Sequence, residues 1–167
     1  DLYVEIDPEV VLNAWQFFRL PEESARLNIV IGDGYRYMAT SRKRFDLILI
    51  DGFDARGRPG KLHTLPFYRL CRARLAEDGM LVVNLLSRRT RARPNANPIR
   101  KAFDDRVLVL PPCDANTVVV AKVGAPIRLS FDKLRAAANS FRARTGVNLL
   151  PTIARVIEGR HKSAGRI

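Results

Sequence analysis

The sequence predicts an α/β fold, in which a mostly parallel sheet is covered by helices on both faces. Two observations carry this prediction: strand and helix patterns alternate along the chain, and most of the strand segments are apolar without polar alternation. Two later strand segments, 107–111 and 116–123, are joined by a short turn and predict an antiparallel hairpin at the carboxyl-terminal edge. With 167 residues, 47% of them hydrophobic, the chain is long enough for one domain with a buried core.

The amino-terminal part alternates three strands with helices. The strands are expected at 2–6, 27–31 and 45–50. Asp7 followed by Pro8 is typical of a helix N-cap with proline at the first helical position, and apolar spacing continues this helix to Leu20. A short helix containing Met38 follows the second strand. Strand-helix alternation of this kind places the carboxyl ends of all three strands at one edge of the sheet.

The carboxyl-terminal part adds a strand, the hairpin and further helices. A helix is expected over 66–76, ended by Asp78-Gly79, and an apolar strand over 80–86. Further helices are expected at 97–103, 131–144 and 149–157, and a loop at the Arg-rich run 88–93. On the helix expected over 66–76, Phe67, Tyr68 and Cys71 are interpreted as core residues rather than as chemical groups.

The organisation of the chain is predicted to be a single domain, residues 1–158, followed by a disordered basic tail, residues 159–167. The chain opens directly in a strand and without methionine. We therefore expect this domain to be incomplete, lacking a first strand and the glycine-rich turn that would follow it.

Charge and composition limit the classes of function. The formal net charge is +12, from 29 basic and 17 acidic residues, but the basic residues are spread along the chain, and the dense run 88–93 has no interleaved aromatics for base stacking. We therefore do not expect nucleic-acid binding. No apolar stretch approaches the roughly 20 residues that span a bilayer, so no membrane association is expected. Cys71, Cys113 and the two histidines form no metal-ligand cluster in sequence, so we expect no metal and a reducing, cytoplasmic setting.

Acidic residues close three successive strands of the predicted sheet. They are Glu5, Asp33 and Asp51. One acid after a strand is an ordinary turn residue, but three at the same edge favour a binding site, because ligands of open parallel sheets lie beyond the carboxyl ends of the strands. A carboxylate at Glu5 can accept hydrogen bonds from both ribose hydroxyls, and Asp33, between two glycines, can accept one from an adenine amino group.

The order of these segments resembles a known family. VEIDPEVV, VIGDGYRYM, FDLILIDGFDARG and PFYRLCRARLAEDGMLVVNL, within about residues 3–86, are similar to the spermidine synthases, the polyamine aminopropyltransferases, which share the Rossmann-like fold of S-adenosylmethionine-dependent methyltransferases. The resemblance implies a transferase of polyamine biosynthesis that moves an aminopropyl group from decarboxylated S-adenosylmethionine to a polyamine such as putrescine. It leaves a homodimer open.

The resemblance also implies roles for individual residues. Glu5 and Ile6 would bind the nucleoside of the co-substrate, and Asp33 with Gly34 would contact its adenine. Asp51 and Asp54 would be the two acids of a D-x-x-D loop. Asp51 would be the catalytic acid, and both would bind the amine substrate, with Asp54 helping to hold it.

Departures from the family pattern fall mainly on the amine side. Ala55 stands where a proline is usual, Asn84 stands where a glutamine is usual, and 111–114 reads Pro-Pro-Cys-Asp between the hairpin strands. Two alternatives therefore stay open. One is a methyltransferase of the same fold that uses S-adenosylmethionine itself, and the other is a degenerate, non-catalytic module that binds nucleic acid.

Overall fold

The computed structural model describes residues 1–54, 57–58, 60–86, 95–125 and 130–163, with the side chains of 159–163 left aside. The Arg-rich run 88–93 and the departure at Ala55 lie outside the described residues. The strands are β1 (Leu2–Glu5), β2 (Asn28–Ile31), β3 (Phe45–Ile50), β4 (Leu75–Leu86), β5 (Val107–Val109) and β6 (Asn116–Lys122). The helices are α1 (Pro8–Phe18), α2 (Gly34–Thr40), the 3₁₀ turn η1 (Gly60–His63), α3 (Leu65–Arg74), α4 (Asn97–Ala102), α5 (Phe131–Thr145) and α6 (Leu150–Ser163).

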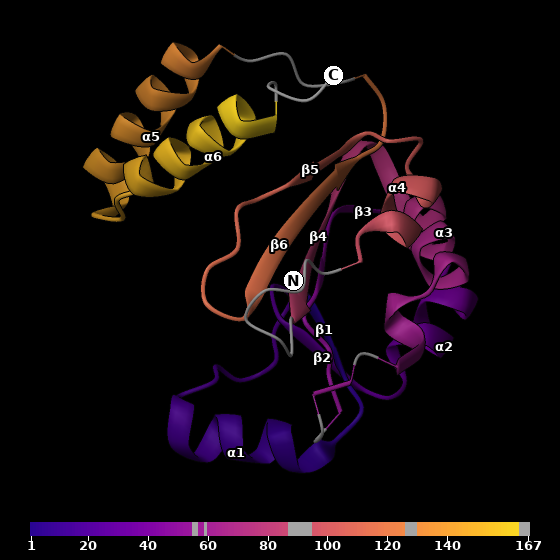
Figure 1. The fold of residues 1–167 in the computed structure, drawn as a ribbon. Coiled ribbons are helices and arrows are strands. Elements are labelled where there is room, and N and C mark those ends of the chain that lie inside the picture. The colour runs from indigo at the N-terminus through magenta and orange to yellow at the C-terminus, as the bar shows by residue number, and fades with distance from the viewer. Residues whose placement is uncertain (55–56, 59, 87–94, 126–129, 164–167) are drawn as a thin grey trace.

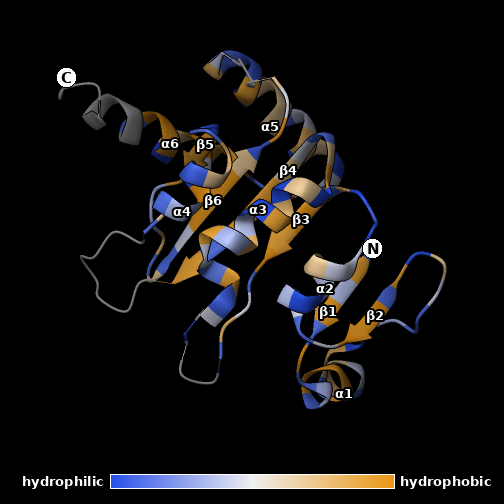
Figure 2. Ribbon diagram, turned by 90° about the vertical axis from the view of Figure 1, so that its right-hand side faces the viewer, coloured by the Kyte–Doolittle hydropathy of each residue, from blue (hydrophilic) through white to orange (hydrophobic). Residues whose placement is uncertain are grey.

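Backbone pairing joins the described strands into two sheets. β1 and β2 form a parallel pair, and the second sheet has the order β3-β4-β6-β5. In this second sheet β3 and β4 are parallel, whereas β6 runs antiparallel to both β4 and β5. The predicted α/β fold with an antiparallel hairpin is confirmed, but the described strands form two sheets where one was expected. Figure 2 shows β1 and β2 set beside β3 without pairing to it.

Helices lie on both sides of the strands, as expected for an α/β fold. Figure 1 places α2, α3 and α4 on one side and the α5–α6 pair on the other. The main core lies under α3 and α4, where Phe67, Tyr68, Cys71 and Phe103 are almost fully buried against β4. The prediction that the α3 residues are core residues is therefore confirmed.

The opposite face of β3 is open. Ile48 points into the core and is buried, whereas Leu47 and Leu49, which alternate with it, are 47% and 67% exposed. Side chains alternate between the faces of a strand, so the two leucines lie on the face away from α3.

Several predicted boundaries differ from the structure. The helix expected to run to residue 76 ends at Arg74, and β4 begins at Leu75 rather than at residue 80, because Leu75 pairs with Phe45 of β3. Asp78-Gly79, predicted to end a helix, instead lies within β4, near the register shift in its pairing with β3. At the other end of the chain, α6 continues to Ser163, into the tail that was expected to begin at residue 159.

Candidate active site

The end of β1 forms a turn around Glu5. Asp7 N–H donates to Glu5 Oε1 at 3.0 Å, and Asp7 Oδ1 in turn accepts from Glu9 N–H at 2.9 Å, which makes Asp7 the N-cap of α1. The turn fixes the Glu5 carboxylate at the carboxyl end of the strand and leaves further acceptor positions on it, since a carboxylate offers about four. Ile6, the next residue, is an exposed apolar side chain.

Asp33 closes β2 and starts α2. Its Oδ1 accepts from Arg36 N–H at 3.0 Å, so one function of Asp33 is to cap the helix. The cap uses one oxygen of the carboxylate. Gly34, the first residue of α2, follows directly and has no side chain to cover the approach to Asp33.

Asp51 follows the last residue of β3 and is held by a side chain from β4. Asn84 Nδ2 donates to Asp51 Oδ1 at 2.9 Å, across 33 positions of sequence. An ionised carboxylate only accepts, so this bond fixes which end of the Asn84 amide faces Asp51. The other end, Asn84 Oδ1, is buried and has no hydrogen-bond partner among the residues that the structure describes. A buried acceptor of this kind is costly to leave unpaired, so Asn84 offers a position for a donor beside Asp51.

Asp54 lies in a tight turn closed by Arg58. Arg58 N–H donates to Asp54 Oδ1 at 2.8 Å, and Arg58 Nε donates to Asp54 Oδ2 at 2.6 Å. The carboxylate predicted to hold an amine is therefore already paired with a guanidinium. Nothing in the sequence pattern indicated this pair.

Leu62, in η1, contacts the loops that follow both β2 and β3. A Cβ atom added at Gly52 would lie 2.7 Å from Leu62 Cδ1, and one added at Gly34 would lie 3.6 Å from Leu62 Cδ2. Leu62 thus packs between the Asp33-Gly34 and Asp51-Gly52 segments. Leu62 was not among the predicted site residues, although a glycine after each acid was a usable signal of close approach.

His63, beside Leu62, sits in an aromatic environment. Its ring lies 5.6 Å from Phe53 and 6.2 Å from Tyr68, measured between centroids. Its Nε2 is buried and has no hydrogen-bond partner in the described part of the chain. Burial lowers the pKa of His63 below its ordinary value of 6.5, which favours a neutral ring at pH 7.

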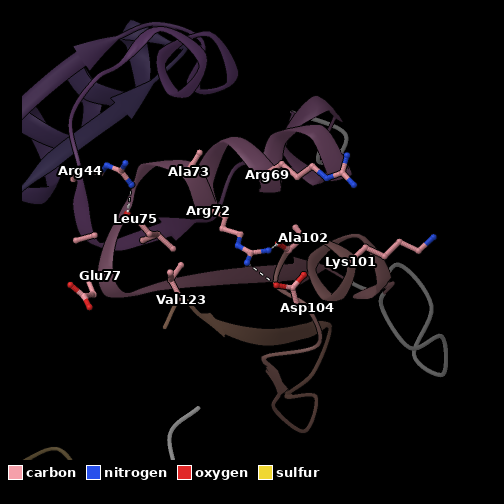
Figure 3. Close-up of a pocket in the computed structure, with 11 residues that line it drawn as sticks. Arg44, Arg69, Arg72, Ala73, Leu75, Glu77, Lys101, Ala102, Asp104 and Val123 are labelled. Carbon is pink, nitrogen blue, oxygen red and sulfur yellow. Dashed lines mark hydrogen bonds and ion pairs between the residues drawn. The ribbon is translucent and has the colours of Figure 1, made fainter. Parts of the chain in front are cut away.

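A cavity of about 620 Å³ lies elsewhere, at the opposite end of β4. Figure 3 shows Arg72 reaching across it to the Ala102 carbonyl and to Asp104, while Arg44 donates to the Leu75 carbonyl. None of the acids predicted for the site lines this cavity. The candidate site is therefore the edge formed by the strand-end loops and not this cavity.

Comparison with known proteins places the chain in a family. The sequence profile of the spermine/spermidine synthase domain matches residues 2–87. The chain belongs to the spermidine synthase family. A polyamine aminopropyltransferase of Neisseria meningitidis serogroup A is 34% identical over 146 residues, which cover 87% of this chain and 56% of that protein. The chain thus spans little more than half the length of this relative.

Two solved structures share the fold. A spermidine synthase in complex with the transition state analogue AdoDATO superposes with a TM-score of 0.58 at 22% identity, covering 80% of this chain and 49% of that one. Human methyltransferase-like protein 13 in complex with SAH gives a TM-score of 0.65 at 20% identity, covering 92% of this chain and 70% of that one. At these identities the likeness shows the Rossmann-like methyltransferase fold alone.

Within the described residues, neither a membrane-spanning helix nor a cluster of metal ligands is present. No helix in this part of the spermidine synthase-like chain has the length and apolar character needed to cross a bilayer. Over the same ranges, no three His, Cys, Asp or Glu side chains gather closely enough to hold a metal ion.

Proposed function

We propose that the protein containing this chain transfers an aminopropyl group from decarboxylated S-adenosylmethionine to a polyamine such as putrescine. The observation that carries the proposal is the row of carboxylates at the ends of β1, β2 and β3, namely Glu5, Asp33 and Asp51. Family membership supports it, and so does the binding of AdoDATO by a spermidine synthase of the same fold.

The nucleoside part of the co-substrate is assigned to the ends of β1 and β2. Glu5 accepts from the ribose hydroxyls through the acceptor positions that the Asp7 N–H leaves open. Ile6 offers an apolar surface beside it. Asp33 accepts from the adenine amino group with the oxygen that does not cap α2, and the absent side chain of Gly34 lets the base approach.

The transfer step is assigned to Asp51. A primary amine has a pKa of about 10, so it is protonated at neutral pH and must lose a proton before it attacks. The amine nitrogen then forms a bond to the methylene carbon beside the sulfonium, and the C–S bond breaks with its electron pair passing to sulfur, which becomes a neutral thioether. Asp51, held by Asn84, orients the amine and accepts the proton, while Asp54 attracts the second ammonium of a diamine.

The assignment is tested by an Asp51→Asn substitution in the protein that contains this chain. We expect the rate of aminopropyl transfer to putrescine to fall by about 10²- to 10⁴-fold, the range typical of a lost general base. Chromatography of the product amine measures this rate. Asp46→Asn is the matched control, since Asp46 is an exposed acid of β3 at the other end of the strand. Full activity of the Asp51→Asn protein would show that the catalytic assignment is wrong.

A methyltransferase of the same fold is the alternative, and the likeness to human methyltransferase-like protein 13 supports it. Calorimetric titration separates the two. Tighter binding of decarboxylated S-adenosylmethionine supports aminopropyl transfer, and tighter binding of S-adenosylmethionine supports methyl transfer. We propose, in addition, that the protein acts in the cytoplasm. The homodimer and the absence of nucleic-acid binding stay predictions.

A further inference from the structure

The turn that follows Asp54 is closed by Arg58 through both its backbone and its side chain. Asp54 N–H donates to the Arg58 carbonyl at 2.8 Å, and Arg58 N–H donates back to Asp54 Oδ1 at 2.8 Å. Gly57, at φ 65°, makes the reversal, with its N–H 2.7 Å from the Asp54 carbonyl. The Arg58 side chain then folds over the turn and places Nε 2.6 Å from Asp54 Oδ2. Both carboxylate oxygens are therefore engaged by one residue.

This arrangement places a permanent cation on an acid of the candidate site. Arg58 cannot lose its proton in a protein, so the pair stays charge-balanced at every pH where Asp54 is ionised. The Asp51 carboxylate differs, because its partner from β4 is the neutral amide of Asn84. Of the two acids in the D-x-x-D segment, Asp51 thus keeps its net negative charge and Asp54 does not.

The pair is open to exchange with solvent ions. The Arg58 side chain is 56% exposed and that of Asp54 is 40% exposed. Exposed pairs of this kind are weak and are screened by salt. An incoming ammonium can therefore replace the guanidinium side chain, while the backbone bond from Arg58 N–H to Asp54 Oδ1 remains and preserves the turn.

We propose that Arg58 is a specificity-determining residue that competes with the second ammonium of a diamine for Asp54. The inference rests on the proposed function, because it takes Asp54 as the position for that ammonium. A diamine gains less from Asp54 than it would from a free carboxylate. A monoamine, which needs only Asp51, loses nothing. Arg58 therefore lowers the affinity of the site for diamines relative to its affinity for monoamines.

The test compares putrescine with n-butylamine, which has the same carbon chain and one amine fewer. Arg58→Gln removes the charge and keeps the backbone bond. We expect the dissociation constant for putrescine, measured by calorimetry, to fall about two- to fivefold, which corresponds to roughly 0.4–1 kcal/mol. The constant for n-butylamine stays the same. Arg58→Lys, which keeps a cation in place, binds both amines as the unmodified protein does.

The control is Arg135→Gln on α5. Arg135 pairs with Asp132 at 3.4 Å in another exposed Arg–Asp ion pair, so its loss changes the net charge by the same amount. An equal gain in putrescine affinity in both variants would reduce the effect to overall charge and overturn the proposal.

A spectroscopic readout separates this inference from the proposed function. The Arg58 Nε–H resonance should shift when putrescine is added and stay in place when n-butylamine is added. The role of Arg58 is overturned if putrescine leaves the Arg58 Nε–H resonance unchanged and the dissociation constant for putrescine is the same in Arg58→Gln as in the unmodified protein. It is also overturned if neither of these two proteins binds putrescine. Failure of transfer from decarboxylated S-adenosylmethionine, with the Arg58 effects intact, overturns the proposed reaction only.

Discussion

Replacing Gly52 by alanine should destabilise the fold through one contact. The new Cβ would lie 2.7 Å from Leu62 Cδ1, and that methyl group must retreat by about 0.7 Å to reach the 3.4 Å at which ordinary contact begins. Overpacking costs about 1–3 kcal/mol, and we expect the lower end, about 1 kcal/mol, because Leu62 is only partly buried and the clashing atom ends a flexible side chain. In a chain of 167 residues this lowers the melting temperature by about 2–4 °C.

Gly34→Ala is the matched control for this prediction. Its Cβ would lie at ordinary contact distance, 3.6 Å from Leu62 Cδ2, and Gly34 is the first residue of a helix, so alanine should be neutral or slightly stabilising there. In a Leu62→Ala background, Gly52→Ala should cost almost nothing, because the clashing methyl is gone. Urea denaturation measures the free energy of unfolding of the unmodified protein, the three single variants and the double variant. Equal effects of the two glycine substitutions, or additivity with Leu62→Ala, would refute the packing of Leu62 on Gly52.

Three further outcomes are expected. Hydrogen bonding to Arg72 lowers the pKa of Asp104. A carboxyl whose pKa is lowered by folding stabilises the fold at a pH above its ordinary pKa of 3.8, and this contribution is lost as the pH falls. The free energy of unfolding, measured by urea titration, should therefore drop more between pH 6 and pH 3 in the unmodified protein than in Asp104→Asn. Burial raises the pKa of Cys71 to about 12, so thiol reagents at pH 8 should modify the exposed Cys113 and reach Cys71 only on unfolding, as peptide mass analysis can show. Phe103→Ala, at a fully buried core position, should lower the free energy of unfolding by about 3–5 kcal/mol in the same denaturation assay.

Local sequence signals predicted the elements whose determinants are themselves local. Asp7 and Pro8 start α1 as expected, because an N-cap carboxylate and a proline at the first helical position act within a few residues. The predicted start of β4 was wrong because its determinant is not local. Asp78-Gly79 resembles a helix end, but pairing of Leu75 with Phe45 extends the strand ahead of it, and no local pattern reports that pairing.

The candidate site was predictable only in part. The acids could be found because each follows an apolar strand, and parallel strands bring their carboxyl ends to one edge. Their partners could not be found in the same way. The Asn84–Asp51 bond depends on the register of β4 against β3, and the Arg58–Asp54 pair depends on the path of a turn through Gly57. These contacts place a neutral amide on Asp51 and a cation on Asp54, a difference in partners that the sequence did not indicate.

The acids of the site are carried by two sheets that do not pair within the described chain. Glu5 ends a strand of the first sheet and Asp51 follows a strand of the second, so neither sheet alone fixes the distance between them. Leu62 contacts the loop after β2 at Gly34 and the loop after β3 at Gly52. It therefore links the nucleoside side of the site to its catalytic side. The Gly52→Ala prediction tests that link directly, because a cost well below about 1 kcal/mol would mean that Leu62 does not pack against the loop after β3.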